Sequence, residues 1–449
     1  MIVPPAVRGT AVVATSERVS AVYSLTRAVP VTMLDADWLS SRDRDVFVWE
    51  QPSTNVRIIG LGASVVQFGQ GPDRFAEMGA AVAATFARIR RLDAEGPGPR
   101  FVGGFGFTAD HPAPEGRWGG FPAACMVLPE ICLVQNGGEA WATATASGGD
   151  VDEADALLHL QTVLDSLSPA PRGFAEPVPV AVALDEGSSH YRDLVAAAAS
   201  EIAAGAFRKL VVARAVDAAT AANPDRILDA LRTRYPGCVT YAVTSGDKLF
   251  VGATPEPLVQ RTGVAVRSVA LAGTIARGAD PAADDDLAAR LVADPKEREE
   301  HQHVVAGIRQ SLEAMGVRVG PPAEPTVRKL ATVQHLETSI SGETEVAVSL
   351  IDLVGALHPT PAVGGLPEEG AVDWINLNED LERGWYAAPI GYVTADGDGE
   401  FHVALRCALL ERGIARCFVG AGIVAGSDPD RELAETTAKL RAIAGSLAG

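Results

Sequence analysis

The most constraining feature of this 449-residue chain is a run of short apolar segments in its second half that follow one another almost without spacers. Four such segments occupy residues 238–244, 248–254, 257–263 and 264–274. Their β-branched and aromatic residues predict strands, and turn sequences such as SGDK join them. Because parallel neighbours need a long crossover, strands this close together are expected to pair antiparallel.

A second meander and several helices complete the predicted class. Further strands are expected at 388–395, 401–410 and 414–424. Apolar periodicity and end signals predict helices over 73–92, 154–167, 191–204 and 349–357, around 296–308, and from Asp428 to the C-terminus. Asp428 is well placed as the N-cap of the last helix, with Pro429 at its first position. The sequence therefore predicts an α+β fold, with large antiparallel sheets and helices on the outside.

The best candidate boundary within the chain is a proline-rich stretch at residues 166–191. We place the boundary between residues 185 and 186. This divides the chain into an N-terminal α+β region, 1–185, packed on a core formed by 186–449.

Charge and composition exclude several classes of partner. Lys and Arg number 38 against 57 Asp and Glu, a formal net charge of -19, so the surface repels nucleic acid and anionic lipid. An anionic substrate would have to be captured by local cations or by a metal ion. No apolar run approaches the roughly 18 residues of a membrane span, and the N-terminus lacks the pattern of a secretory leader. We expect a cytoplasmic monomer without membrane or nucleic-acid partners. Its five cysteines form no CxxC pair, so neither disulfides nor a zinc knuckle is indicated.

Two helices carry carboxylates next to their apolar stripes. Glu297 and Glu300 continue the stripe of Val304 and Ile308 in one predicted helix. Glu432 and Glu435 lie in the same way along the last helix, together with Lys439. Four converging carboxylates would need a hard cation, above all Mg²⁺. The alternative is that both pairs are solvated helix faces, and spacing alone leaves that alternative open. No HExxH or Cys partner supports zinc at His301 and His303.

Two basic residues do not suit their predicted strands. Lys209 shares a strand face with Val211 and Ala213, so it is either a snorkelling edge lysine or a desolvated amine that could act as a base. Arg406 shares a predicted face with Ala404 and Ala408, which leave room for a ligand carboxylate. Gly420 and Gly422 follow in the next strand, where backbone amides could approach an anion, although a tight turn explains them as well.

From about residue 189 to the C-terminus, the chain resembles the chorismate-binding domain that isochorismate, salicylate, anthranilate and aminodeoxychorismate synthases share. The matching stretches, in the family's order, are FRKLVVAR, GATPEPLV, LAGTIARG, DPKEREEH, VQHLET, LHPTPAVGGLP, RGWYAAPIGY, VALRCALL and FVGAGIVAGSDPDRELAETTAKL. Residues before 189 match only loosely.

The resemblance implies a role for each of these side chains. Glu300 and Glu435 correspond to direct Mg²⁺ ligands, and Glu297 and Glu432 to acids that reach the ion through water. The metal would hold the ring carboxylate of chorismate. The implied substrate contacts are Arg406, Tyr386, Gly420 and Gly422 at the enolpyruvyl carboxylate, Gly273 and Thr274 at the hydroxyl side, His335 in the pocket wall, and Lys439 near the metal.

By the same resemblance, Lys209 and Glu256 indicate which reaction within the family this chain catalyses. Lys209 corresponds to the general base of members that add water at C2, and Glu256 to the general acid that protonates the departing 4-hydroxyl. We therefore expect an Mg²⁺-dependent isochorismate synthase. The alternatives are a salicylate synthase, an amine-adding enzyme and a non-catalytic chorismate-binding homologue. The sequence does not decide whether the product enters a menaquinone or a siderophore pathway. It also leaves open the effect of Ala388, at a position where the family commonly has glycine.

Overall fold

The computed structural model describes residues 12–13, 21–40, 44–93, 95–110, 112–113, 115–148, 152–168, 187–330, 333–345 and 348–447. The expected boundary between residues 185 and 186 lies outside these ranges. The helices are α1 (Arg74–Phe86), α2 (Glu153–Asp165), α3 (Ser188–Ala203), α4 (Pro224–Arg234), α5 (Pro281–Ala293), α6 (Pro295–Ala314), α7 (Leu350–Leu357), α8 (Glu368–Asn378) and α9 (Pro429–Ala444), with short 3-10 turns η1 (Val31–Asp35) and η2 (Pro52–Thr54).

Within these described ranges the strands form two large sheets, in which only the pairs β1–β5 and β2–β6 are parallel. Sheet A contains, in spatial order, β1 (Val12–Val13), β5 (Val65–Gly69), β8 (Ala124–Leu128), β7 (Arg100–Phe105), β20 (Pro389–Thr394), β21 (Gly399–Val403), β14 (Pro257–Thr262), β15 (Ala265–Ala276), β18 (Val333–Thr344) and β16 (Val317–Val319), with β17 (Thr326–Lys329) also paired to β18. Sheet B contains β19 (Gly365–Leu366), β11 (Lys209–Ala219), β23 (Ile414–Ile423), β22 (Cys407–Glu411), β13 (Lys248–Thr254), β12 (Val239–Ser245), β3 (Val46–Gln51), β4 (Val56–Leu61), β9 (Ile131–Asn136), β10 (Glu139–Ser147), β2 (Val22–Ala28) and β6 (Ile89–Arg91). The predicted α+β class and the large antiparallel sheets are confirmed.

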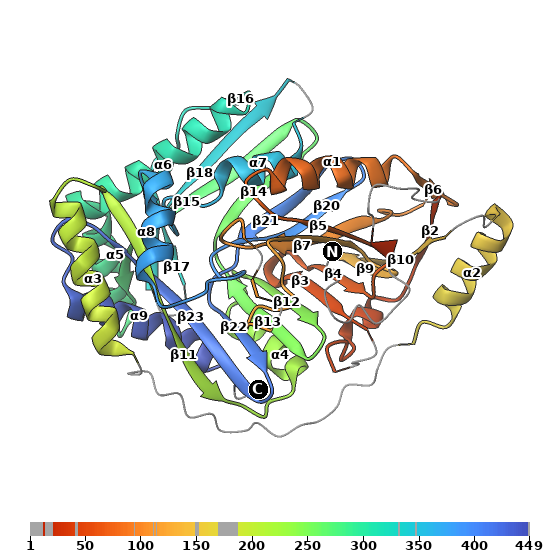
Figure 1. The fold of residues 1–449 in the computed structure, drawn as a ribbon, viewed down its shortest axis with the longest axis horizontal. Helices are drawn as coiled ribbons and strands as arrows, with labels where there is room; N and C mark the ends of the chain where they lie inside the picture. Colours follow the sequence, from red (N-terminus) through yellow and green to blue (C-terminus); the bar gives the residue numbers. More distant parts are fainter. Residues whose placement is uncertain are drawn as a thin grey trace.

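Both sheets mix strands from the two halves of the chain. In sheet A, β7 pairs with β20, and in sheet B, β3 pairs with β12. Figure 1 shows the N-terminal elements, in red and orange, at one side of the molecule, and α3, α5, α6 and α9 gathered at the other. The main core lies between the sheets, where Trp49 of β3 packs edge-on against Tyr392 of β20 and His402 of β21.

The chain passes between the two sheets at one corner, and this corrects two predictions. β13 belongs to sheet B and β14 to sheet A, so these consecutive strands do not pair although only two residues separate them. The predicted strand 401–410 is likewise two strands, β21 in sheet A and β22 in sheet B. Because β13 pairs with β22, and β14 with β21, the two connections run side by side. A strand pattern reports the local backbone and cannot tell which sheet supplies the partner.

Helix α6 contains the predicted stretch 296–308 and extends beyond it at both ends. Asp294 caps it through hydrogen bonds from the backbone amides of Lys296 (2.9 Å) and Glu297 (3.3 Å), and Pro295 holds the first position. Val304, Ile308 and Leu312 are buried, and the helix packs along β15. No helix in the described ranges is long and apolar enough to cross a membrane.

Candidate active site

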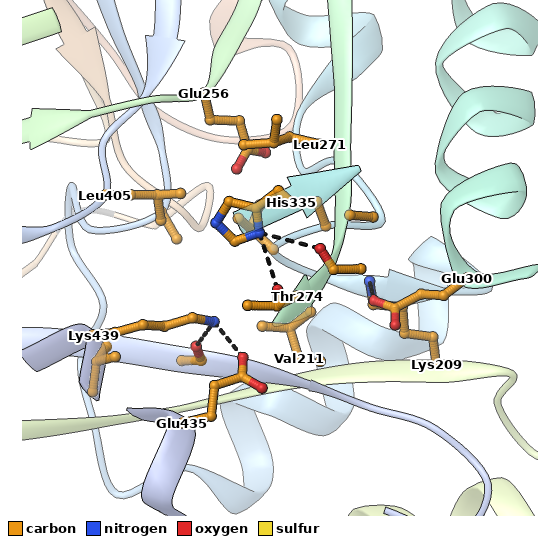
Figure 2. Close-up of a pocket in the computed structure, with 18 of the residues that line it drawn as sticks. Lys209, Val211, Glu256, Leu271, Thr274, Glu300, His335, Leu405, Glu435 and Lys439 are labelled. Carbon is orange, nitrogen blue, oxygen red and sulfur yellow. Dashed lines mark hydrogen bonds and ion pairs between the residues drawn. The ribbon is translucent and has the colours of Figure 1, made fainter. Parts of the chain in front are cut away.

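A cavity of about 150 Å³ lies among β11, β15, α6, β18, β23 and α9 (Figure 2). Every residue to which the sequence assigned a site role lines this one cavity. These residues are Lys209, Glu256, Gly273, Thr274, Glu297, Glu300, His335, Tyr386, Arg406, Gly420, Gly422, Glu432, Glu435 and Lys439. They come from segments more than 200 residues apart in the sequence, so only the fold brings them together.

A second cavity, of about 410 Å³, lies between the sheets in the N-terminal half. The described residues around it are mostly apolar, and Asp45 is the one charged side chain among them. The smaller cavity contains Lys209, Lys296, Arg406 and Lys439. The large negative charge of the protein repels anions, so an anion can be held only where local cations attract it. Of these two cavities, only the smaller one has such cations among its described lining residues.

Lys209 is a buried amine rather than a snorkelling edge lysine. It is 4% exposed, and its Nζ lies 2.7 Å from Oε1 of Glu300. Lys209 pairs with Leu366 of β19, and its side chain lies over Gly422 of β23, the strand on the other side of β11. A Cβ at Gly422 would lie only 2.9 Å from Lys209 Cε, so the missing side chain of Gly422 makes room for the lysine.

Glu256 occupies the connection between β13 and β14, at the corner where the chain changes sheet. Its backbone amide donates to Oγ1 of Thr254 (3.2 Å), and the Thr254 hydroxyl donates to the carbonyl of Val403 (2.5 Å), the last residue of β21. Burial raises the pKa of Glu256 to about 7, against the opposing effect of Lys209. A carboxyl group that keeps part of its protons at neutral pH can donate a proton.

Arg406 lies outside any strand, so its predicted face shared with Ala404 and Ala408 is wrong. It occupies the connection between β21 and β22, with a φ of 49°. A positive φ is uncommon for a residue with a side chain and costs backbone energy. At this corner it turns the guanidinium into the cavity, 3.5 Å from Nε2 of His335.

His335 is held as a neutral ring. Its Nδ1 lies 3.2 Å from the carbonyl oxygen of Gly273 and 3.0 Å from Oγ1 of Thr274. Burial and Arg406 lower the pKa of His335 well below its usual range. Since a carbonyl only accepts hydrogen bonds, we assign the proton to Nδ1, which leaves Nε2 as an acceptor.

The four acids face the cavity from α6 and α9. Glu297 accepts a hydrogen bond from the Thr274 amide (3.0 Å), and burial and Glu300 raise its pKa. Burial and Glu435 raise the pKa of Glu432 to about 7. Glu435 forms an ion pair of 2.7 Å with Lys439, whose Nζ also donates to the carbonyl of Gly420 (3.1 Å; Figure 2). On each helix, burial and the neighbouring acid thus disfavour the charge of one carboxylate, whereas, against the effect of burial, Lys209 lowers the pKa of Glu300.

These four acids are chemically suited to a hard divalent cation, because all of their ligand atoms are carboxylate oxygens. A bound cation would also relieve the repulsion between neighbouring carboxylates. The side chains are not gathered into a ligand cluster. In the described part of the chain, no group of three or more His, Cys, Asp or Glu side chains is placed to hold a metal ion. His301 instead places its Nε2 2.7 Å from Oγ1 of Thr338, inside the fold.

Several lining residues escaped the sequence analysis. Lys296, exposed in the first turn of α6, adds a further cation, and Leu271 and Leu405 add apolar surface. Lys296 precedes Glu297 and Leu405 precedes Arg406 in the sequence. These two residues could therefore have been predicted as direct neighbours of predicted site residues. Ala388 is fully buried in the core and does not line the cavity, so its methyl group faces away.

Comparison with known proteins accounts for this arrangement. A sequence profile described as chorismate binding enzyme matches residues 10–448. The chain belongs to the chorismate-binding enzyme family. This confirms the resemblance, and the match also includes the N-terminal region, which the motifs did not cover.

Two relatives and one solved structure place the chain within the chorismate-binding enzymes. The salicylate biosynthesis isochorismate synthase of Pseudomonas aeruginosa is 36% identical over 413 residues, which cover 90% of this chain and 84% of the relative. Isochorismate synthase MenF of Bacillus subtilis is 34% identical over 423 residues, covering 90% and 88%. The structure of MenF, the menaquinone-specific isochorismate synthase of Escherichia coli, superimposes with a TM-score of 0.78 at 26% identity and covers 97% of both chains.

Proposed function

We propose that the protein is an isochorismate synthase that converts chorismate reversibly to isochorismate in the smaller cavity, with Mg²⁺ as cofactor. The observation that carries the proposal is that one cavity contains a buried lysine, Lys209, and a buried carboxyl group of raised pKa, Glu256. Addition of water at C2 and loss of the 4-hydroxyl require a base and an acid of this kind. The names of the relatives support the same reaction.

Each reacting group has a defined task in this proposal. Lys209, as the neutral amine, takes a proton from the water that attacks C2 and becomes an ammonium group, and Glu256 gives its proton to the 4-hydroxyl, which leaves as water. The double bonds of the ring shift between these positions, so atoms and charges balance. Figure 2 shows Lys209 and Glu256 reaching the cavity from different sides.

The remaining cavity residues would bind the two carboxylates of chorismate, the cations directly and the acids through Mg²⁺. Arg406 and Tyr386 would hold the enolpyruvyl carboxylate, and Glu300 and Glu435, assisted by Glu297 and Glu432, would hold Mg²⁺. When bound, Mg²⁺ supplies Lewis acidity at the ring carboxylate, which is conjugated to the reacting double bonds. Lys439 adds positive charge at the same end of the cavity, and His335 presents Nε2 as an acceptor.

Product identification tests the proposal directly. The purified protein is incubated with chorismate and Mg²⁺, and the products are separated and identified by mass spectrometry and fluorescence. Isochorismate is the expected product. Salicylate, which is fluorescent, would instead indicate pyruvate elimination after isochorismate formation. Anthranilate formed with ammonia, or unchanged chorismate, would contradict the proposal.

The acid role of Glu256 predicts a specific pH dependence. Its pKa is raised to about 7, so the proton it donates is present below that pH and lost above it. We expect kcat/KM to fall as the pH rises through about 7. Glu256→Gln should lower kcat by roughly 10² to 10⁴-fold and abolish this limb of the profile. An unchanged limb in the variant would assign the titration to another group.

The close packing of Lys209 on Gly422 gives a second prediction. Gly422→Ala places a methyl group 2.9 Å from Lys209 Cε and should displace the amine. Misplacement by about 1 Å can cost on the order of 10²-fold, so we expect kcat to fall by about tenfold to a hundredfold. Gly138→Ala is the control, because a Cβ there meets nothing within 4 Å. Equal activity of both variants would mean that Lys209 does not need its present position.

A further inference from the structure

A buried ion pair lies beneath the wall of the cavity without lining it. Glu379 follows α8 directly, and its carboxylate accepts hydrogen bonds from Nε (2.8 Å) and Nη2 (2.5 Å) of Arg383. Their side chains are only 1% and 3% exposed. The guanidinium also stacks over the ring of Phe107, 4.3 Å from its centroid. Burial of two charges costs desolvation free energy that their attraction does not always offset, so a buried ion pair is weak evidence of stabilisation. The groups that the pair holds in place indicate its role instead.

The pair occupies an edge of β11 where a neighbouring strand is missing. Strand β19 pairs with β11 only at Lys209 and Leu210, and the last ladder bond runs from the Val211 amide to the Gly364 carbonyl (2.8 Å). Beyond it, Arg383 Nη2 donates to the carbonyl of Val211 (2.9 Å), and Glu379 Oε1 accepts from the amide of Ala213 (2.8 Å). The two side chains thus continue the hydrogen bonding that a strand would supply.

Arg383 also holds two other parts of the cavity wall, one through its guanidinium and one through its backbone. Its Nη1 donates to the carbonyl of Val363 (2.8 Å), in the loop that lines the cavity beside Ala362. The carbonyl of Arg383 itself accepts from the amide of Tyr386 (2.9 Å), which starts the turn that carries the Tyr386 side chain. The side chain of Arg383 therefore connects β11 with the Val363 loop, and its backbone ties this connection to the Tyr386 turn.

We propose that Arg383 and Glu379 are positioning residues that fix the Lys209–Val211 edge of β11 relative to the Val363 loop and the Tyr386 turn. Neither side chain lines the cavity, so the pair acts through the groups that do. The pair carries no net charge, so it leaves the net charge of the cavity wall unchanged. This inference rests on the proposed function, because Lys209 is the group whose position matters.

The test is a double-mutant cycle between Arg383→Lys and Lys209→Ala, measured as kcat and KM for chorismate with Mg²⁺. A lysine cannot reach all three carbonyl and carboxylate partners of Arg383. We expect Arg383→Lys to lower kcat about tenfold to a hundredfold with a smaller change in KM. In the Lys209→Ala background it should lower kcat no further, because the group that it aligns is gone.

Controls separate alignment from loss of folding. Arg100→Lys alters another buried arginine that lies over an aromatic ring, Tyr392, and should leave kcat unchanged. If Arg383→Lys does not fold, the double variant Arg383→Met with Glu379→Gln leaves no buried charge unpaired, and Gln can still accept from Ala213. It should show the same loss of kcat in the Lys209 background and the same absence of loss in the Lys209→Ala background.

The outcomes distinguish the two proposals. Full turnover of Lys209→Ala alone would remove the proposed base and, with it, the basis of this inference. A large loss in Lys209→Ala, together with normal kcat in Arg383→Lys or an equal loss in both backgrounds, would overturn the positioning role while the proposed function stands.

Discussion

Replacing Lys209 by alanine should lower kcat for isochorismate formation by roughly 10² to 10⁴-fold, the usual contribution of a positioned general base. The amine is 4% exposed and donates a hydrogen bond of 2.7 Å to Glu300, so the substitution removes the base and leaves the Glu300 carboxylate without this partner. Binding of chorismate should be affected less than turnover, because Arg406 and Lys439 remain. Steady-state kinetics, with chorismate binding measured separately by calorimetry, check both statements.

Lys248→Ala is the matched control for this variant. Lys248 is a buried lysine in β13 that donates to the carbonyls of Gly116 and Arg117, away from the cavity. Its removal should lower the thermal unfolding temperature and leave kcat of the folded protein unchanged. If Lys209→Ala behaved in the same way, Lys209 would be a structural residue and another group would activate the water.

Replacing Glu435 by glutamine should produce the largest change in metal dependence. The proposal makes Glu435 a direct Mg²⁺ ligand and Glu432 an acid that acts through water. Loss of an outer acid typically costs about 10 to 100-fold in metal affinity, so Glu432→Gln should raise the half-saturating Mg²⁺ concentration within that range. Glu435→Gln should raise it by more than about 100-fold. Titration of activity with Mg²⁺, and direct binding of Mn²⁺ followed by electron paramagnetic resonance, measure the two effects.

Chelation provides the complementary control for the metal. An excess of chelator should abolish turnover of the unmodified protein, and added Mg²⁺ should restore it. Glu299→Gln is a suitable control variant, since Glu299 is an exposed residue of the same helix that does not line the cavity. Equal Mg²⁺ dependence of Glu435→Gln and Glu299→Gln, or turnover that survives chelation, would contradict the assigned ligands.

The sequence predicted the fold class and the membership of the cavity well because both depend on local signals. The face on which a carboxylate lies follows from helical periodicity, so the spacing of apolar residues was enough to single out Glu297, Glu300, Glu432 and Glu435. The family motifs then connected them with residues elsewhere in the chain, such as Glu256.

The sequence did not predict the corner at which the chain changes sheet. Residues 401–410 read as one strand because apolar residues continue through Arg406, and the positive φ of that residue has no signature in the side-chain pattern. The burial of Lys209 was equally undetermined, since it depends on β19 and α6 closing over β11. The Glu379–Arg383 pair escaped notice because an acid and a base four residues apart are typical of an exposed helix face.

Conversion of chorismate in water labelled with heavy oxygen tests the central claim most directly. If Lys209 activates a solvent water for attack at C2 and Glu256 releases the 4-hydroxyl as water, the isochorismate formed with Mg²⁺ must carry the label at its C2 hydroxyl. Mass spectrometry of the product and of its fragments locates the label. Unlabelled isochorismate, or no conversion at all, would contradict the account.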